Sequence, residues 1–292
     1  MEYFKATPIV LRHLQFSHFL PWTHIGQELA QESPALATAY FQASTESLHN
    51  LPAHLLGDWA TLGRSMYKGN WRSSSLACRF FELSPQILQQ ANLAELKMLV
   101  RFLERLAVRS YDLAIESLNL APEVLTQIDR GDRDAFLDLA WLLADVVPRD
   151  AKVCFEVAPR TLQRVRKDER FHFLKLVRLV AGSRPTDCLS FFQEGARALG
   201  ATDWTLHPKI LSLTEELIGS DPAAGVEFLK NCPSVLGRLR PKDMEVWFRE
   251  GQGLLKEAPE AGADYFRLES RRSQDVIEHL AEPHAFLEHV HR

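Results

Sequence analysis

The sequence predicts an all-α solenoid made of seven tandem helical-hairpin repeats, each 37 residues long. Three observations lead to this prediction: apolar columns recur every 37 residues, prolines recur at the same period, and no segment has a convincing strand pattern. A single hairpin cannot bury its apolar face alone, so the copies must stack on one another. We expect a right-handed superhelix of the HEAT or TPR kind.

The period is easiest to follow from a column of small residues, which return every 37 residues after a first step of 40. The column consists of Ala37, Ala77, Ala114, Ala151, Cys188, Gly225 and Gly262. A large apolar residue follows four positions later, at Phe41, Phe81, Leu118, Phe155, Phe192, Leu229 and Phe266. A third column lies upstream, at Trp22, Trp59, Leu99, Phe136, Phe173, Ile210 and Trp247. These columns place the seven copies at residues 17–53, 54–93, 94–130, 131–167, 168–204, 205–241 and 242–278.

Prolines mark the start of the second helix of the hairpin. They stand three residues before the small column, at Pro34, Pro148, Pro185, Pro222 and Pro259. Proline suits the first helical turn because its missing N–H would have no partner there. Ser33 and Asp221 precede proline and are the expected N-caps, and Ser73 and Ser110 are expected to cap where proline is absent.

A second proline column follows the small column by eight residues, at Pro85, Pro122, Pro159 and Pro233. Proline disfavours a helical conformation for the residue before it, so we expect the second helix to stop or kink here. Each copy then has a first helix of about fifteen residues and a second of about eleven, followed by a one-turn segment. A three-residue insertion near Lys68 to Trp71 predicts a longer loop in the second copy.

Glycine recurs inside the first helix, four residues after the aromatic column, at Gly26, Gly63 and Gly251. Because glycine costs a helix up to about 1 kcal/mol relative to alanine, its presence predicts that a neighbouring helix approaches too closely for a side chain. Trp22, Trp59 and Trp247 share their column with leucine, isoleucine and phenylalanine, so we predict that they belong to the core.

The ends of a repeat array must hide their apolar flanks from water. We expect residues 1–16 to form an N-terminal cap, residues 17–278 the solenoid, and residues 279–292 a C-terminal cap or tail. The apolar N-terminal segment should pack on the first hairpin, and the alternative is a docking site for another domain or subunit.

The composition excludes several classes of protein. The net charge of −4 does not favour nucleic acid, which is an unlikely partner for a chain without a basic excess. The longest apolar run, residues 136–147, is too short and too charged to cross a bilayer, and the N-terminus does not have the pattern of a signal peptide. Four widely spaced cysteines suit a reducing compartment, so we expect a cytoplasmic protein.

No sequence motif predicts catalysis, a cofactor or a metal site. The C-terminal histidines His284, His289 and His291 do not have a carboxylate or cysteine at helical ligand spacing, and a polar tail is the favoured interpretation. Cys188 and Cys232 fall in repeat columns of small residues, so we predict that both are buried and unreactive.

Two basic groups recur at matching offsets in the fourth and sixth copies. They are Arg164, Arg166, Lys167 and Arg170, and then Arg238, Arg240 and Lys242. The favoured interpretation is a set of solvated turns near helix C-termini, and the sharper alternative is a contact with an acidic partner. Nucleic acid fits less well, because Asp168, Glu169 and Asp243 dilute the charge and no aromatic residue is interleaved. Trp71, in the insertion, is the tryptophan that we expect to be exposed and a possible contact residue.

The pattern W-x3-G followed by A-x3-F-x2-SP-x2-L resembles the helical-repeat region of NorD-like proteins. Here it consists of Trp59 and Gly63 and then Ala77, Phe81, Ser84, Pro85 and Leu88. The segment Tyr265 to Glu278 is also similar to the end of that region. Proteins of this family carry a von Willebrand A domain and work beside MoxR-type AAA+ ATPases. The metal-binding DxSxS loop of that domain is not in this chain, so the resemblance implies a scaffold arm that docks such an ATPase or its client.

We therefore expect a non-enzymatic protein–protein interaction scaffold, because a solenoid offers a long concave surface. The alternative is an enzyme with a groove active site, such as a HEAT-like DNA glycosylase. That alternative requires a continuous basic groove with an inward aspartate and aromatic residues, whereas a mixed or acidic surface favours the scaffold.

Overall fold

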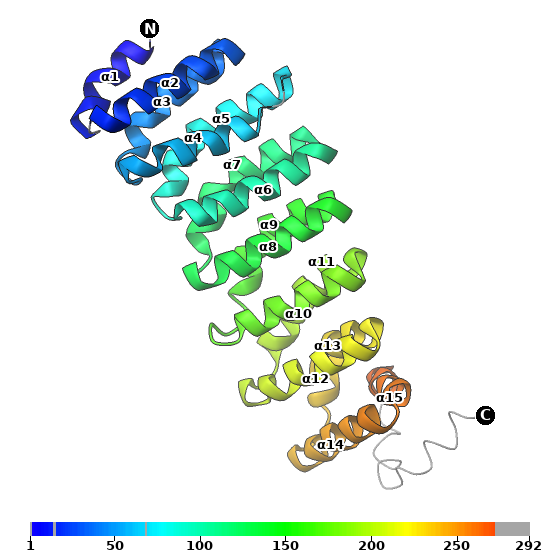
Figure 1. Cartoon of the computed structure of the whole chain (residues 1–292). Coiled ribbons are helices and arrows are strands. Elements are labelled where there is room, and N and C mark those ends of the chain that lie inside the picture. The colour runs from blue at the N-terminus through cyan, green and yellow to red at the C-terminus, as the bar shows by residue number, and fades with distance from the viewer. Residues whose placement is uncertain (1, 14–15, 68, 272–292) are drawn as a thin grey trace. The chain divides into compact units, whose positions relative to one another are not determined.

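The computed structural model describes residues 2–13, 16–67 and 69–271, and in these ranges it contains fifteen α-helices, two short 3₁₀ helices and no strand (Figure 1). The chain divides into two compact units, Met1–Pro159 and Arg160–Arg292, and the boundary falls inside a helix. The expected all-α class is therefore confirmed.

The first unit contains the helices that precede residue 160. They are α1 (Glu2–His13), α2 (Phe16–Glu32), α3 (Pro34–Ser47), η1 (Ala53–Leu55), α4 (Leu56–Ser65), α5 (Trp71–Leu88), α6 (Leu93–Arg109), α7 (Tyr111–Gln127), α8 (Arg130–Val146) and most of α9 (Pro148–Leu162). The helices pack in two series: α1, α3, α5 and α7 follow one another in one layer, and α2, α4, α6 and α8 in the other. Hairpin contacts join the layers, between α2 and α3, α4 and α5, and α6 and α7.

The second unit repeats this arrangement. It contains α10 (Arg170–Ser183), α11 (Pro185–Ala201), η2 (Trp204–Leu206), α12 (His207–Ser220), α13 (Pro222–Leu236), α14 (Pro241–Glu257) and α15 (Pro259–Arg271). Here α10, α12 and α14 form one series and α11, α13 and α15 the other, and each even-numbered helix contacts the odd-numbered helix that follows it. Each unit is thus a serial stack of helical hairpins.

The predicted starts of the second helices are confirmed. α3, α9, α11, α13 and α15 all begin at the proline of the first column. Ser33 and Ser110 accept from Leu36 N and Leu113 N, and Asp221 accepts from the backbone N–H groups of Ala223 and Ala224. A single residue joins the two helices of six hairpins, so these turns are short.

The predicted cap at Ser73 is wrong. α5 begins one turn earlier, at Trp71, after a connection that contains Gly69 with φ +76°. Asn70 is the N-cap, and its side chain accepts from Ser73 N at 3.0 Å while Ser73 Oγ lies 3.3 Å from Asn70 N, as in a capping box. The three-residue insertion supplies the residues of this additional turn, so Asn70 and not Ser73 precedes the helix.

Of the two outcomes expected at the second proline column, a stop or a kink, the stop is wrong. α5, α7, α9 and α13 run through Pro85, Pro122, Pro159 and Pro233, and the second helices from α3 to α13 have 14 to 18 residues instead of about eleven. At Pro85 a side chain replaces the lost backbone donor. Ser84 Oγ lies 3.3 Å from the Phe81 carbonyl oxygen, the group that an N–H at residue 85 would otherwise bond.

The aromatic column lies in the core, as predicted. Trp22, Trp59 and Trp247 are buried, and Trp59 Nε1 donates to Ser84 Oγ at 2.9 Å. Burial also raises the pKa of the Tyr40 hydroxyl, which donates to the Trp22 carbonyl oxygen at 3.3 Å. Cys188 and Cys232 are buried as expected, and burial raises the pKa of the Cys232 thiol.

The helical glycines are required by close packing, as predicted for Gly26, Gly63 and Gly251. A Cβ atom on any of them would overlap the ring tip of the phenylalanine in the second helix, which is Phe41, Phe81 and Phe266 respectively. At Gly225 and Gly262 the obstacle is the backbone of the first helix, at Ile218 and Leu255. The small column therefore sets how closely the two helices of a hairpin approach.

A buried ion pair joins successive hairpins in the first unit. Arg133, at the start of α8, lies 3.5 Å from Glu95, at the start of α6, and both side chains are almost completely buried. Arg133 also donates to the carbonyl oxygens of Ile128 and Gln90, and Glu95 accepts from Asn92 N at 2.7 Å. The same two repeat columns hold Glu169 and His207 in the second unit, where Glu169 Oε2 lies 2.6 Å from His207 Nδ1.

The two predicted caps differ in how far the structure describes them. α1 packs against α3 and α2 and buries Ala6 and Val10, while Phe4 and Leu11 on its other side are exposed. The predicted C-terminal cap, residues 279–292, lies outside the described residues, as do His284, His289 and His291. None of the described helices has a stretch both long and apolar enough to traverse a bilayer.

Two glycines in α14 provide a matched test of the hairpin packing. We expect Gly251→Ala to destabilise the protein by about 1–3 kcal/mol, because the new Cβ displaces the buried Phe266 ring. Gly253 has open space around it, so Gly253→Ala should stabilise the protein by up to about 1 kcal/mol through helix propensity. Urea denaturation followed by circular dichroism measures both changes, and equal effects would contradict the packing account.

A second test concerns the buried ion pair. Arg133→Leu removes two bonds to backbone carbonyls and leaves the Glu95 carboxylate buried without its cation, so we expect a loss of about 3–5 kcal/mol. Arg79→Leu, which removes an exposed pair with Glu82 and an exposed hydrogen bond to Asn119 in the same unit, should cost about 1 kcal/mol. The thermal unfolding midpoints of the two variants provide the comparison, and a small effect at Arg133 would show that the pair is dispensable.

Candidate interaction surface

An open surface hollow of about 680 Å³ lies in the second unit, between the loop that precedes α10 and the connection between α11 and α12. Its lining residues are Arg164, Arg166, Leu199, Gly200, Ala201, Thr202, Asp203, Trp204 and His207. The two backbones approach closely here, because the Arg164 carbonyl oxygen would lie 3.3 Å from a Cβ at position 200. Two of the basic residues singled out by the sequence, Arg164 and Arg166, therefore face this hollow.

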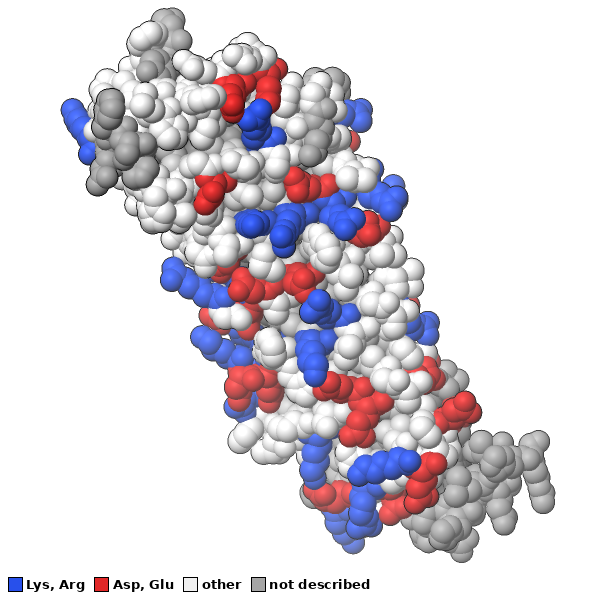
Figure 2. All heavy atoms as spheres, viewed as in Figure 1, with Lys and Arg blue, Asp and Glu red and all other residues white. Residues whose placement is uncertain are grey.

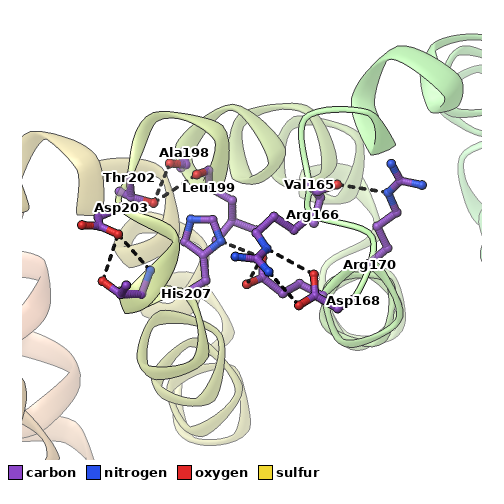
Figure 3. Close-up of polar contacts among 11 residues, drawn as sticks. Val165, Arg166, Asp168, Arg170, Ala198, Leu199, Thr202, Asp203 and His207 are labelled. Atoms are coloured by element: carbon purple, nitrogen blue, oxygen red, sulfur yellow. Dashed lines mark hydrogen bonds and ion pairs between the residues drawn. The ribbon is translucent and has the colours of Figure 1, made fainter.

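Arg166 is held in place by acidic and aromatic partners at once. Its Nε and Nη2 atoms donate to the two carboxylate oxygens of Asp168, at 3.2 and 3.0 Å (Figure 3). Its guanidinium carbon lies 4.6 Å from the centre of the Trp204 ring, within the range of a cation–π interaction. Glu169 Oε1 is 3.9 Å from Arg166 Nε. The side chain thus links the loop before α10 to the loop before α12.

The pair of Glu169 and His207 lies beside this arginine. Both side chains are largely buried, and the hydrogen bond between them joins the N-terminal ends of α10 and α12 (Figure 3). His207 Nε2 is buried without a hydrogen-bond partner among the described residues.

Two aspartates on the rim of the hollow are stabilised as carboxylates. The hydrogen bond from Arg166 lowers the pKa of Asp168 below its usual value, and the charges of Arg166 and His207 add to the effect. For Asp203, hydrogen bonds from the backbone N–H and the hydroxyl of Thr205 lower the pKa, and the charge of His207 adds to them. The rim therefore carries both signs of charge close together at neutral pH.

Trp204 is the residue of this surface that sequence reasoning missed. Its side chain is 59% exposed, whereas the other tryptophans with a described side chain are buried or half-buried. The sequence offered one signal, because Trp204 lies outside the apolar column that contains Trp22, Trp59 and Trp247. It stands 38 residues after Arg166, so its contact with that arginine depends on the stacking of two hairpins.

The other five basic residues that the sequence singled out lie outside the hollow. Lys167 and Arg170 do not line the hollow, and Arg170 Nε instead donates to the Val165 carbonyl oxygen at 3.0 Å (Figure 3). Arg238, Arg240 and Lys242 belong to the region between α13 and α14, where all three are exposed. Arg240 is bonded to Asp243 at 2.7 Å.

Trp71 was expected to be exposed, but its side chain lies outside what the structure describes, and only its backbone position at the start of α5 is known. Among the residues that are described, no three His, Cys, Asp or Glu side chains are grouped so that they could hold a metal ion. The described residues around the hollow offer charged groups, hydrogen-bonding groups and the exposed indole of Trp204.

Comparison with known proteins adds no family to these observations. No family model matches the chain, and no curated protein or solved structure matches it at a significant level.

Proposed function

We propose that this chain is a non-enzymatic scaffold that binds another protein through the surface around Trp204. The observation that carries the proposal is the exposure of this indole, because tryptophan and arginine are enriched among the residues that contribute most to protein–protein binding. Trp204 and Arg166 form such a pair, and hydrogen bonds to Asp168 also hold the arginine in place. A preorganised side chain loses less conformational entropy when a partner binds.

The proposal includes a finer architecture than the all-helical packing described above. In this proposed architecture, seven copies of the 37-residue repeat form one right-handed superhelix, and partners bind along the surface of the superhelix. The serial packing of hairpins within each unit supports this architecture, as does the recurrence of single-residue connections at Ser110, Val147, Arg184, Asp221 and Ala258. A MoxR-type AAA+ ATPase, or its client, is the partner that the sequence resemblance suggests.

A groove enzyme such as a HEAT-like DNA glycosylase is the second candidate. It requires a continuous basic surface for the phosphate backbone. On the face shown in Figure 2, lysines and arginines lie beside aspartates and glutamates in both units. Ion pairs also join corresponding helices of neighbouring hairpins, as Arg64 is paired with Glu28 and Glu32, and Lys175 with Glu215. This mixed surface favours the scaffold.

Cross-linking with quantitative mass spectrometry tests the proposal. We expect tagged wild-type protein to enrich at least one specific protein. Trp204→Ser should reduce that enrichment about tenfold or more, as is typical of a hot-spot residue in an interface. Val108→Ser, at a site in the first unit that is even more exposed, is the matched control and should leave the enrichment unchanged. The proposal fails if no protein depends on Trp204.

A further inference from the structure

We propose that three consecutive loops of the second unit form one surface that binds an extended acidic segment of a protein partner. The segments span residues 163–169, residues 202–206 with the short helix η2, and residues 237–243 with the first residues of α14; they lie at the starts of α10, α12 and α14, and we call them the loop surface. In Figure 1 they lie one after another along the same side of this unit. The inference rests on the scaffold function proposed above and specifies the chemistry of the partner.

The first argument is the set of cations that the fold leaves without partners. The side chains of Arg164, Arg238 and Lys242 are exposed and have no ion pair or hydrogen bond within the described part of the chain. Arg166 and Arg240, in contrast, are occupied by Asp168 and Asp243. The paired arginines hold their loops in shape, and the unpaired cations remain available to carboxylates from outside.

The second argument is the position of the exposed indole. Arg164 and Arg238 occupy the same repeat column, two repeats apart, and Trp204 belongs to the loop between them. The loop surface thus presents a basic, an aromatic and a basic element in succession. Arg166 covers Trp204 at 4.6 Å, and the indole still exposes more than half of its surface to a partner side chain.

The geometry of a helical stack sets the spacing that the partner must match. Helices packed side by side are about 10 Å apart, so two repeats separate the basic elements by roughly 20 Å. An extended chain advances about 3.3 Å per residue, so this distance corresponds to about six residues. The matching segment carries acidic residues about six positions apart, with an aromatic or aliphatic residue midway between them.

Trp204 lies between the two basic groups, so the expectation that no aromatic residue is interleaved with them is wrong, but the charges still favour an acidic protein segment over single-stranded nucleic acid. Nucleic acid binds to a continuous positive groove that follows its backbone. Here Asp168, Asp203 and Asp243 interrupt the positive charge, and the whole chain carries a net charge of −4. A segment with a few separated carboxylates avoids these aspartates, whereas a phosphate at every nucleotide does not.

Fluorescence anisotropy tests the inference with defined probes of equal length. The main probe is a labelled peptide with two Glu-Asp clusters six residues apart and a central Phe. The comparison probes are the same peptide with Gln and Asn in place of the acids, a peptide with adjacent acidic clusters, and oligothymidylate. We expect the main probe to bind with the highest affinity, and its affinity to fall as salt is added.

Variants of the full-length protein then locate the binding site. Arg164→Gln combined with Arg238→Gln should weaken binding of the main probe about tenfold, and Trp204→Ala by a similar factor. Lys230→Gln combined with Lys256→Gln makes the same change in net charge at exposed sites on α13 and at the end of α14, and should leave affinity unchanged. Circular dichroism verifies that each variant is folded.

Three outcomes would overturn the inference: tighter binding of oligothymidylate than of the main probe, equal loss of affinity in both double variants, or no binding of the main probe. The cross-linking experiment separates these failures from a failure of the scaffold function. If Trp204 is required for enrichment of a partner but the acidic peptide does not bind, the scaffold proposal stands and the acidic chemistry is wrong. If neither result is obtained, both proposals fail.

Discussion

The close contact between the two helices of a hairpin is the constraint on which the rest of the structure depends. In three hairpins a phenylalanine of the second helix packs its ring tip on a glycine of the first, as Phe81 does on Gly63. Such a contact buries a large aromatic surface and brings the helices together without a cavity. Two of these three hairpins have a single-residue connection, at Ser33 and Ala258, and hairpins without the glycine share it, as α6 and α7 do at Ser110.

Polar contacts at the starts of the first helices determine how successive hairpins stack. Glu95 and Arg133 in the first unit, and Glu169 and His207 in the second, occupy the same columns and join one hairpin to the next. Because these side chains are buried, an unpaired member would be costly, and the pairs therefore specify a single register of stacking. The register in turn decides which loop residues become neighbours.

The candidate surface is a consequence of that register. Arg166, Trp204 and Arg240 are exposed and lie outside the apolar columns, so residues at such positions can differ between copies while the packing is kept. The column that holds Arg166 holds Asp203 in the next copy and Arg240 in the one after. The cations, the aspartates and the exposed Trp204 can thus differ from loop to loop on a constant framework, which is how repeat proteins commonly acquire binding surfaces.

The sequence by itself determined the all-helical class, the helix starts at proline and the burial of Trp22, Trp59 and Trp247, because these depend on local backbone preferences and on a period that the chain displays directly. The tertiary structure decided the rest. In the structure α5 continues through Pro85, where the Ser84 hydroxyl donates to the carbonyl oxygen that lacks its usual N–H donor. The N-cap of α5 is Asn70 instead of the predicted Ser73. The tertiary structure also placed Trp204 against Arg166, residues 38 positions apart in the sequence. Contacts between hairpins depend on how far each hairpin is rotated and shifted against its neighbour, and neither helix propensity nor periodicity encodes that quantity.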